Sequence, residues 1–243
     1  MRYLDLTLPT AAENLALDEA LLEEAEAGGE PRETLRLWEP RQTMVVVGRS
    51  SRIAAEVRTD ACRELGIPVL RRPSGGAAIV TGPGCLMYAL VLSYRLRPEL
   101  RALSRAHQWV LGTLAAALEP HVPGVRCCGT SDLAVDGRKF SGNSARCRRG
   151  HLLYHGTLLY DFPLPLVGRC LNMPPRTPDY RAGRPHEGFL ANLPLSGGVL
   201  RRVLVQAFAA DEPYGPWPEG RMAQLAAEKY ARTEWNDPES PLV

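Results

Sequence analysis

Three short segments of this chain carry residue types that can do chemistry on a carboxylate or a phosphate. The first, residues 71–78, reads Arg-Arg-Pro-Ser-Gly-Gly-Ala-Ala. Its small residues let a ligand approach the backbone closely, and backbone amides beside two guanidinium groups suit a phosphate or a carboxylate. A glycine-rich turn with two surface arginines is the alternative, because isolated Gly-rich loops are weak signals. The segment matches neither a P-loop nor a dinucleotide-binding fingerprint.

The second segment, residues 131–144, contains Asp136-Gly137 between two strand-like patterns, and this dipeptide is among the strongest hairpin signals. Alternation along the second strand places Lys139 and Ser141 on one face. A lysine there, followed by Gly142, can project into a pocket and place a point charge on a phosphoryl or carboxyl oxygen. A solvated hairpin lysine is the alternative.

The third segment is an apolar strand, Leu153 to Asp161, in which His155 precedes a glycine. A lone histidine in such a strand is either a base or, more often, a hydrogen-bonded core residue. Further on, residues 178–189 hold two arginines, a histidine and two aromatic residues in a proline-rich stretch. Such a stretch is typical of a lid or a recognition loop.

Helices and strands must position these segments. Residues 11–27 are dense in strong helix formers and stop at Gly28-Gly29, with Thr10 as the N-cap and Glu13 as its capping-box partner. Strand-like patterns follow at 34–38 and 43–47, helical spacing at 54–65, and another strand at 67–72.

Beyond the Gly-rich segment, residues 85–93 read as a strand, 98–118 as a helix, and 131–162 as β structure. Residues 163–194 predict an ordered crossing loop or a flexible lid, and helices are expected at 196–209 and 218–232. No internal repeat or clean linker divides the chain. We therefore predict one α+β domain over residues 1–243, with mixed and antiparallel sheets flanked by helices.

The composition excludes several classes of protein. The chain has 243 residues, 29 basic against 27 acidic side chains and a net charge of +2, which gives no basic field that argues for nucleic acid. No apolar run approaches the roughly 20 residues of a bilayer span, and no secretory signal is present, so we expect a cytoplasmic location without membrane association. The six cysteines show no repeating spacing, and we predict neither a disulfide nor a structural metal.

Together and in this order, the segments resemble the lipoate-protein ligase A family, within the biotin and lipoate protein ligase superfamily, over about residues 30–236. The first family motif is matched by residues 71–78, with Ala77 in place of the usual third glycine. The second, an Asp-Leu, a short turn, a lysine and Ser-Gly, is matched by 132–142, and the third, His-Gly-Thr-Leu-Leu, by 155–159. The run 227–236 resembles the end of the family's catalytic domain.

The resemblance implies the class II synthetase-like fold of that superfamily and an enzyme with two half-reactions. ATP, brought with Mg²⁺, activates the carboxylate of lipoate or octanoate as an acyl-adenylate, and a lysine amine of a small carrier domain then attacks it. The implied acceptor is the lipoyl domain of a 2-oxoacid dehydrogenase or a glycine cleavage H-type protein.

The resemblance also implies roles for individual residues. Lys139 would bind the activated carboxyl and α-phosphate oxygens, and Asp132 would orient the incoming amine or a metal-bound phosphate. The Gly-rich segment would line the acyl tail and the carboxyl group. The residues expected to contact substrate are Arg71, Arg72, Ser74, Gly75, Gly76, Ala77, Ala78, Ser141, Gly142, His155, Gly156 and Thr157.

Two departures from the family pattern leave other functions open. Residues 81–85 stand where many members have His-Asp, one residue and Gly-Asn. We also expect no C-terminal accessory domain, which some members supply as a separate chain. One alternative is an ATP-independent transferase that moves octanoyl or lipoyl groups between carrier proteins through a cysteine thioester, with Cys170 or Cys85 as the nucleophile. Another is a noncatalytic binder of lipoate or a lipoyl domain, which the intact Lys139 disfavours.

Overall fold

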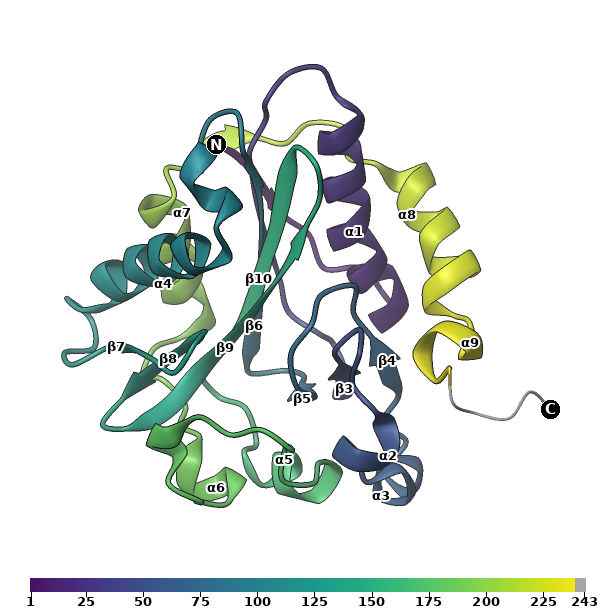
Figure 1. Ribbon diagram of the computed structural model, residues 1–243, viewed down its shortest axis with the longest axis vertical. Helices are drawn as coiled ribbons and strands as arrows, with labels where there is room; N and C mark the ends of the chain where they lie inside the picture. Colours follow the sequence, from purple (N-terminus) through teal and green to yellow (C-terminus); the bar gives the residue numbers. More distant parts are fainter. Residues whose placement is uncertain (239–243) are drawn as a thin grey trace.

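An eight-stranded sheet forms the centre of the molecule in the computed structural model, which describes residues 1–238 (Figure 1). Its strand order is β11-β1-β2-β6-β10-β9-β8-β7. The strands are β1 (Arg2–Asp5), β2 (Thr34–Trp38), β6 (Cys85–Ser93), β7 (Arg126–Cys128), β8 (Asp132–Val135), β9 (Arg138–Cys147), β10 (His151–Leu159) and β11 (Glu212–Pro213). The first three strands in this order run parallel and the remaining neighbours pair antiparallel, which confirms the predicted mixed sheet.

Both faces of the sheet are covered, because its central strands β6 and β10 are buried along their whole length. Successive side chains of a strand point to opposite faces, so each strand contributes to two cores. Leu86 and Leu90 of β6 pack with α4 (Leu103–Leu118) and α7 (Gly197–Ala207), whereas Met87 and Val91 face α1 (Ala11–Ala27). Figure 1 shows α4 and α7 on one side of the sheet and α1 on the other.

Helix α1 begins as the sequence predicts. The Thr10 side chain accepts from the Glu13 backbone N–H, and the Glu13 carboxylate accepts from the Thr10 N–H, which confirms the capping box. The helix lies between the large sheet and α8 (Glu219–Leu225), and its middle is therefore buried on more than one side. Asp18 and Glu19 are among these buried residues and need partners.

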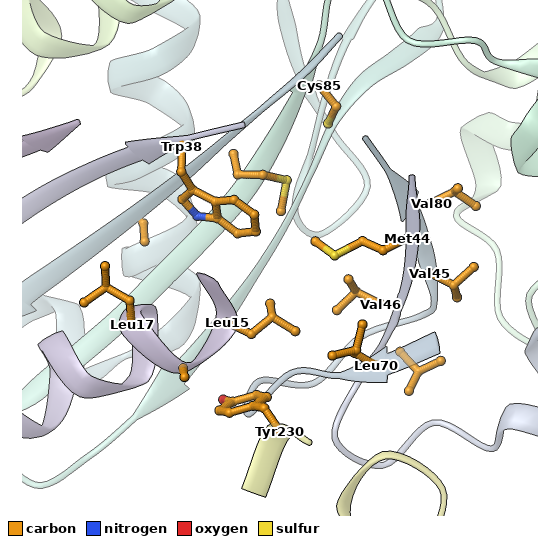
Figure 2. Close-up of a cluster of buried hydrophobic side chains, with 14 of the residues drawn as sticks. Leu15, Leu17, Trp38, Met44, Val45, Val46, Leu70, Val80, Cys85 and Tyr230 are labelled. Atoms are coloured by element: carbon orange, nitrogen blue, oxygen red, sulfur yellow. The ribbon is translucent and has the colours of Figure 1, made fainter. Parts of the chain in front are cut away.

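A second, three-stranded sheet shares a hydrophobic core with α1. β3 (Met44–Val47) runs parallel to β4 (Val69–Arg71) and antiparallel to β5 (Ile79–Thr81). Figure 2 shows the core that joins this sheet to α1, in which Val46 and Leu70 lie near Leu15 and Tyr230. The Gly-rich segment connects β4 to β5, so the small sheet fixes both of its ends.

The helix expected over 54–65 is interrupted. The structure has α2 (Ile53–Glu56) and α3 (Thr59–Glu64), separated by Val57 in an extended conformation. Val57 forms an antiparallel bridge with Leu171, so pairing with a distant segment overrides the local helical pattern. The helix expected over 98–118 likewise starts as a 3₁₀ turn, η1 (Pro98–Arg101), and continues as α4 after an extended Ala102.

The crossing segment 163–194 holds three short helical turns, α5 (Pro165–Cys170), η2 (Asp179–Arg181) and α6 (His186–Phe189). The helix expected over 196–209 is confirmed as α7, whose N-cap is Ser196. The helix expected over 218–232 is only partly regular: α8 ends at Leu225, a π-helical turn η3 spans Ala226–Tyr230, and α9 (Thr233–Asn236) follows.

The β8–β9 hairpin turns at the predicted dipeptide. Asp136 has a φ of 51° and Gly137 a φ of 69°, as a type I′ turn requires. A β-bulge between Leu133 and Ala134 shifts the register, and Asp132 then pairs with Gly142. Within residues 1–238, none of the helices has the length and apolar character that crossing a bilayer would require.

Candidate active site

A central cavity of about 370 Å³ opens between α1, the Gly-rich segment and strands β6, β9 and β10. Its lining includes the apolar side chains of Leu15, Val46 and Met87. Lys139 and Asp132 line the same cavity. A cavity that combines apolar lining with a cationic side chain can hold an acid with a hydrocarbon tail.

A side cavity of about 150 Å³ lies next to the central one, between β9 and the crossing segment. Its apolar lining includes Leu159, Val167, Leu171 and Phe189. The two cavities share one wall, which consists of Ala77, Ala78, Ile79, Asp132, Lys139, Gly142, Thr157, Arg176 and Pro178. A ligand that fills both cavities must therefore pass Lys139.

Lys139 is part of this shared wall and pairs with Asp132, with 2.7 Å between Nζ and Oδ1. The pairing follows from the bulged register, which sets Asp132 of β8 opposite Gly142 of β9. A Cβ atom on Gly142 would lie 2.8 Å from the Lys139 Nζ, so the glycine leaves room for the ammonium group. Of the two interpretations that the sequence left open for Lys139, the structure supports the one in which the lysine lines a cavity.

Tyr180 of η2 completes the group by donating its hydroxyl to the Asp132 Oδ2 at 2.8 Å. Burial, and then the neighbouring Asp132, raise the pKa of Tyr180, so the phenol stays protonated and remains a donor. Each oxygen of the Asp132 carboxylate therefore has one partner. Through this bond, residues 178–189, predicted as a lid or a recognition loop, contact the site.

The two arginines that open the Gly-rich segment bind backbone carbonyls. Arg72 donates to the carbonyl oxygens of Val46, Gly75 and Ala77, and it borders the central cavity. Burial lowers the pKa of Arg72 to about 10, which leaves the guanidinium charged at neutral pH. Arg71 lines neither cavity and donates to carbonyls that include that of Gly48. The structure thus places Arg71 in the support of the loop, in contrast to its expected contact with substrate.

Other polar contacts fix the loop itself. The Glu56 carboxylate accepts from the Ala78 N–H at 2.6 Å, and the Ser144 hydroxyl donates to the Gly75 carbonyl at 2.8 Å. Gly76 has a φ of 92°, in the region that favours glycine. A Cβ atom on Gly48 would lie 1.9 Å from the Gly76 oxygen, so two backbone segments touch here. The loop is held from both sides before any ligand arrives.

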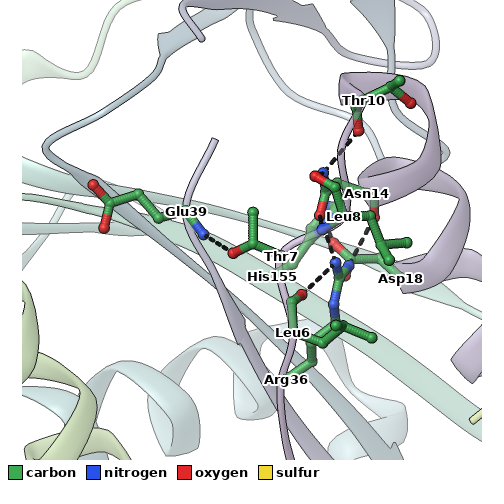
Figure 3. Close-up of polar contacts among 9 residues, drawn as sticks. All are labelled: Leu6, Thr7, Leu8, Thr10, Asn14, Asp18, Arg36, Glu39 and His155. Atoms are coloured by element: carbon green, nitrogen blue, oxygen red, sulfur yellow. Dashed lines mark hydrogen bonds and ion pairs between the residues drawn. The ribbon is translucent and has the colours of Figure 1, made fainter. Parts of the chain in front are cut away.

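His155 belongs to a buried polar chain that crosses from β10 to α1. Its Nε2 lies 2.5 Å from the Ser74 Oγ, and its Nδ1 lies 3.7 Å from the Asp18 Oδ2. The other Asp18 oxygen is 2.5 Å from the Arg36 guanidinium, which also binds the Asn14 side chain (Figure 3). His155 and Asp18 line the central cavity, so His155 is both a hydrogen-bonded core residue and part of the site.

The structure brings most of the predicted substrate-contacting residues to the cavity walls. Those on a wall are Arg72, Gly76, Ala77, Ala78, Ser141, Gly142, His155, Gly156 and Thr157. Those behind the wall are Arg71, Ser74 and Gly75. The Thr157 hydroxyl accepts from the Gly142 N–H at 3.3 Å, which joins the second and third motifs. Their contact with a substrate stays a prediction.

Neither proposed nucleophile reaches a cavity. Cys85 and Cys170 are fully buried, and neither is among the residues that line the two cavities. Burial raises the pKa of Cys85 to about 12 and also raises the pKa of Cys170. The geometry gives no support to a thioester on either cysteine.

Sequence reasoning missed Asp18 and Glu56, two carboxylates that line the cavities. Asp18 and its neighbour Glu19 interrupt the apolar run of α1 between Leu17 and Ala20, and a carboxylate buried there needs a partner on another element. Glu56 gave no local signal, because a glutamate in a short helix is normally solvated. In the part of the chain that the structure describes, no three His, Cys, Asp or Glu side chains gather closely enough to hold a metal ion.

Comparisons with known proteins place the chain in one family. The model of the lipoyl protein ligase A/B catalytic domain matches residues 10–194. An octanoyl-[GcvH]:protein N-octanoyltransferase of Kyrpidia tusciae is 35% identical over 61% of this chain and 57% of its own length. The lipoate-protein ligase LplJ of Bacillus subtilis is 24% identical over 94% of this chain and 70% of its own. The chain thus spans less than two thirds of the first of these relatives.

Solved structures show the same fold. A bi-partite lipoate protein ligase of Thermoplasma acidophilum, studied with its E2 lipoyl domain, superposes with a TM-score of 0.81 at 21% identity, over 97% of this chain and 95% of the other. The matched family model covers all three motifs and the residues that line both cavities. It does not extend to the C-terminal elements that support the site. The chain belongs to the lipoyl protein ligase A/B catalytic domain family.

Proposed function

We propose that this enzyme is an ATP-dependent lipoate or octanoate ligase, which forms an acyl-adenylate and passes the acyl group to a lysine of a lipoyl carrier domain. The observation that carries the proposal is the pair of cavities that meet at Lys139. An acyl-adenylate has an apolar tail, a central acyl phosphate and an adenosine. Two cavities that share Lys139 in their lining suit such a three-part ligand.

In the first half-reaction, an oxygen of the acid carboxylate attacks the α-phosphorus of ATP and pyrophosphate leaves. The tail would lie along Leu15, Val46 and Met87, and the adenine among Val167, Leu171 and Phe189. The Lys139 ammonium stabilises the negative charge that develops on the bridging and α-phosphate oxygens. Mg²⁺ would arrive on the ATP phosphates, and Asp132 and Glu56 are the carboxylates of the side cavity.

In the second half-reaction, the amine of the carrier lysine attacks the acyl carbon, an amide bond forms and AMP leaves. Lys139 again faces the oxygens that gain charge. The Asp132 carboxylate accepts hydrogen bonds, so it can orient the incoming ammonium group and take up a proton as the amine attacks. Tyr180 keeps one oxygen of that carboxylate in place.

The proposed acceptor is a lipoyl domain of a 2-oxoacid dehydrogenase or a glycine cleavage H-type protein. The support comes from the relatives, one of which is named for transfer from octanoyl-GcvH and another of which was studied with an E2 lipoyl domain. A separate accessory chain that assists adenylation remains part of the proposal.

A second candidate is octanoyl or lipoyl transfer between carrier proteins without ATP. The name of the Kyrpidia relative favours it. Against it stands the position of Cys85 and Cys170, which the fold keeps away from both cavities. A transferase would therefore need another nucleophile or direct transfer from donor to acceptor.

The test is the intact mass of a purified lipoyl domain after incubation with this protein, Mg²⁺ and octanoate or lipoate. The ligase predicts a mass gain that requires ATP. A gain that appears only with an octanoyl-carrier donor, and not with ATP, would support the transferase instead. If no mass gain appears with ATP or with the octanoyl-carrier donor, the chain carries out neither reaction alone. Adding presynthesised octanoyl-adenylate would then test the second half-reaction separately.

A further inference from the structure

We infer that Trp235 and Asn236 are positioning residues for the Gly-rich loop, acting through Arg71. They belong to a C-terminal strap, residues 226–236, formed by η3 and α9. The strap lines neither cavity, yet it contacts the supports of two walls of the central cavity. The inference rests on the proposed function only in naming the ligand of that loop as an acid.

The strap forms hydrogen bonds with the end of β4, where the Gly-rich loop begins. The Asn236 Oδ1 accepts from the Arg71 N–H at 2.9 Å, and the Trp235 Nε1–H donates to the Arg71 carbonyl at 2.8 Å. The Arg71 Nε–H donates back to the Trp235 carbonyl at 3.0 Å. Two side chains of α9 thus bind both backbone groups of one residue, and that residue's side chain binds α9.

The Arg71 side chain connects α9 to the loop after β3 through further hydrogen bonds. Its Nη1 donates to the carbonyls of Gly48 at 2.7 Å and Ser51 at 2.8 Å. A guanidinium has five donors in a rigid plane, so bonds to α9 on one edge and to residues 48–51 on the other set the distance between the two segments.

Residues 48–51 in turn hold the Gly-rich loop. The Arg49 N–H donates to the Ser74 carbonyl at 2.8 Å, and the Ser51 hydroxyl donates to the Gly76 carbonyl at 3.0 Å. The absence of a side chain on Gly48 lets it lie against Gly76. The path from Asn236 to the cavity wall at Gly76 is therefore continuous through hydrogen bonds of ordinary length.

The other end of the strap supports the opposite wall. The Lys229 Nζ lies 2.7 Å from the Glu19 Oε2, and the Tyr230 hydroxyl donates to the same oxygen at 2.7 Å. Glu19 follows Asp18, which lines the central cavity from α1. The Lys229 ammonium also stands 4.0 Å above the Trp235 ring, which joins the two ends of the strap. The strap therefore sets the separation of α1 and the Gly-rich loop.

The test compares Asn236→Ala and Trp235→Phe with the wild-type protein by amide hydrogen exchange and by acyl-transfer kinetics. Loss of these bonds should speed exchange in peptides covering residues 48–51 and 72–78 by about fivefold to tenfold. The KM for the acid should rise by a similar factor while kcat changes less, because the Lys139 site stays intact. Trp235→Phe keeps an aromatic ring under Lys229 and so preserves the fold of the strap.

Asn192→Ala is the matched control, because Asn192 also bonds through its side chain to both backbone groups of one residue, Phe162. It should lower thermal stability without changing exchange at 48–51 or 72–78. Unchanged exchange there in both strap variants would overturn the inference, as would equal changes in the control. Exchange needs no substrate, so it decides the matter even where an acid fails to bind and the proposed function fails.

Discussion

At the scale of single residues, the site depends on one ammonium group whose surroundings are fixed by its neighbours. Lys139 is held by Asp132, Asp132 by Tyr180, and the space for the ammonium by Gly142. The Lys139 side chain is 25% exposed and that of Asp132 11% exposed, so the pair is accessible to a ligand that enters either cavity. An incoming anion can therefore compete with Asp132 for Lys139.

Lys139→Ala should reduce acyl transfer at least about 100-fold, the usual effect of removing one group that stabilises transition-state charge. The free energy of unfolding should change by about 1 kcal/mol or less, since the ion pair is partly exposed and Asp132 keeps its bond to Tyr180. Transfer rates and urea unfolding of the same preparation check both parts. Wild-type turnover in a folded variant would contradict the role of Lys139.

Cys85→Ala and Cys170→Ala should retain the wild-type transfer rate, with a loss of stability of about 1 kcal/mol from the missing buried atom. Because the pKa of Cys85 is about 12, its thiolate population rises only as the pH approaches that value. At neutral pH the folded protein should therefore resist alkylation at Cys85, while the exposed Cys127 and Cys147 react. Loss of turnover in either variant, with the fold intact, would revive the thioester route.

At the scale of elements, the site is assembled where loops touch through their backbones. The turn after β3 and the Gly-rich loop after β4 approach closely at Gly48 and Gly76. A Cβ atom at either glycine would clash with its surroundings. The register of β8 against β9 depends on a bulge, and the turn at Asp136-Gly137 depends on two positive φ angles. These backbone features, more than side-chain identity, place the three motifs around one cavity.

Gly48→Ala should therefore abolish acid binding and destabilise the fold by roughly 1–3 kcal/mol, because its Cβ would lie 1.9 Å from the Gly76 oxygen and backbone must move. Isothermal titration with octanoate and a thermal melt measure the two effects. The matched control is Gly112→Ala in α4, whose Cβ would meet nothing within 4 Å. Similar behaviour of the two variants would refute the close contact of the loops.

The sequence allowed the local features to be predicted and concealed the long-range ones. The capping box at Thr10, the Asp136-Gly137 turn and the strands around the three motifs depend on residues next to one another in the chain. The break between α2 and α3 depends on Val57 pairing with Leu171, and Arg71 is engaged by α9, more than 160 residues away. Periodicity and local spacing carry no information about such partners.

At the scale of the whole molecule, two hydrophobic cores lie on the two faces of the large sheet, and the central cavity opens on the α1 face. The other face, with α4 and α7, forms a hydrophobic core that stabilises the sheet. Its stability responds to pH through His107 of α4, whose Nδ1 lies 2.8 Å from the Tyr154 hydroxyl of β10. Burial raises the pKa of Tyr154, so the phenol is the donor and the imidazole is the neutral acceptor.

Burial lowers the pKa of His107 below its ordinary value of 6.5. Its unfolded form therefore binds a proton first as the pH falls, and the contribution of this histidine to stability is complete above 6.5 and declines below it. His186, whose pKa burial also lowers, acts in the same direction. Urea unfolding at pH 7.5 and pH 5.5 should show a smaller loss of stability in His107→Gln than in the wild type, and an equal loss would contradict the assignment.

In the proposed reaction, the two cavities accommodate the two halves of an acyl-adenylate with Lys139 between them. The most direct test is a crystal structure of the protein with a non-hydrolysable octanoyl-adenylate analogue. We expect the octanoyl chain beside Leu15 and Val46, the adenine between Val167 and Phe189, and the Lys139 Nζ within hydrogen-bond distance of the linkage that replaces the acyl phosphate. An analogue bound with its adenosine outside the side cavity, or away from Lys139, would contradict the claim.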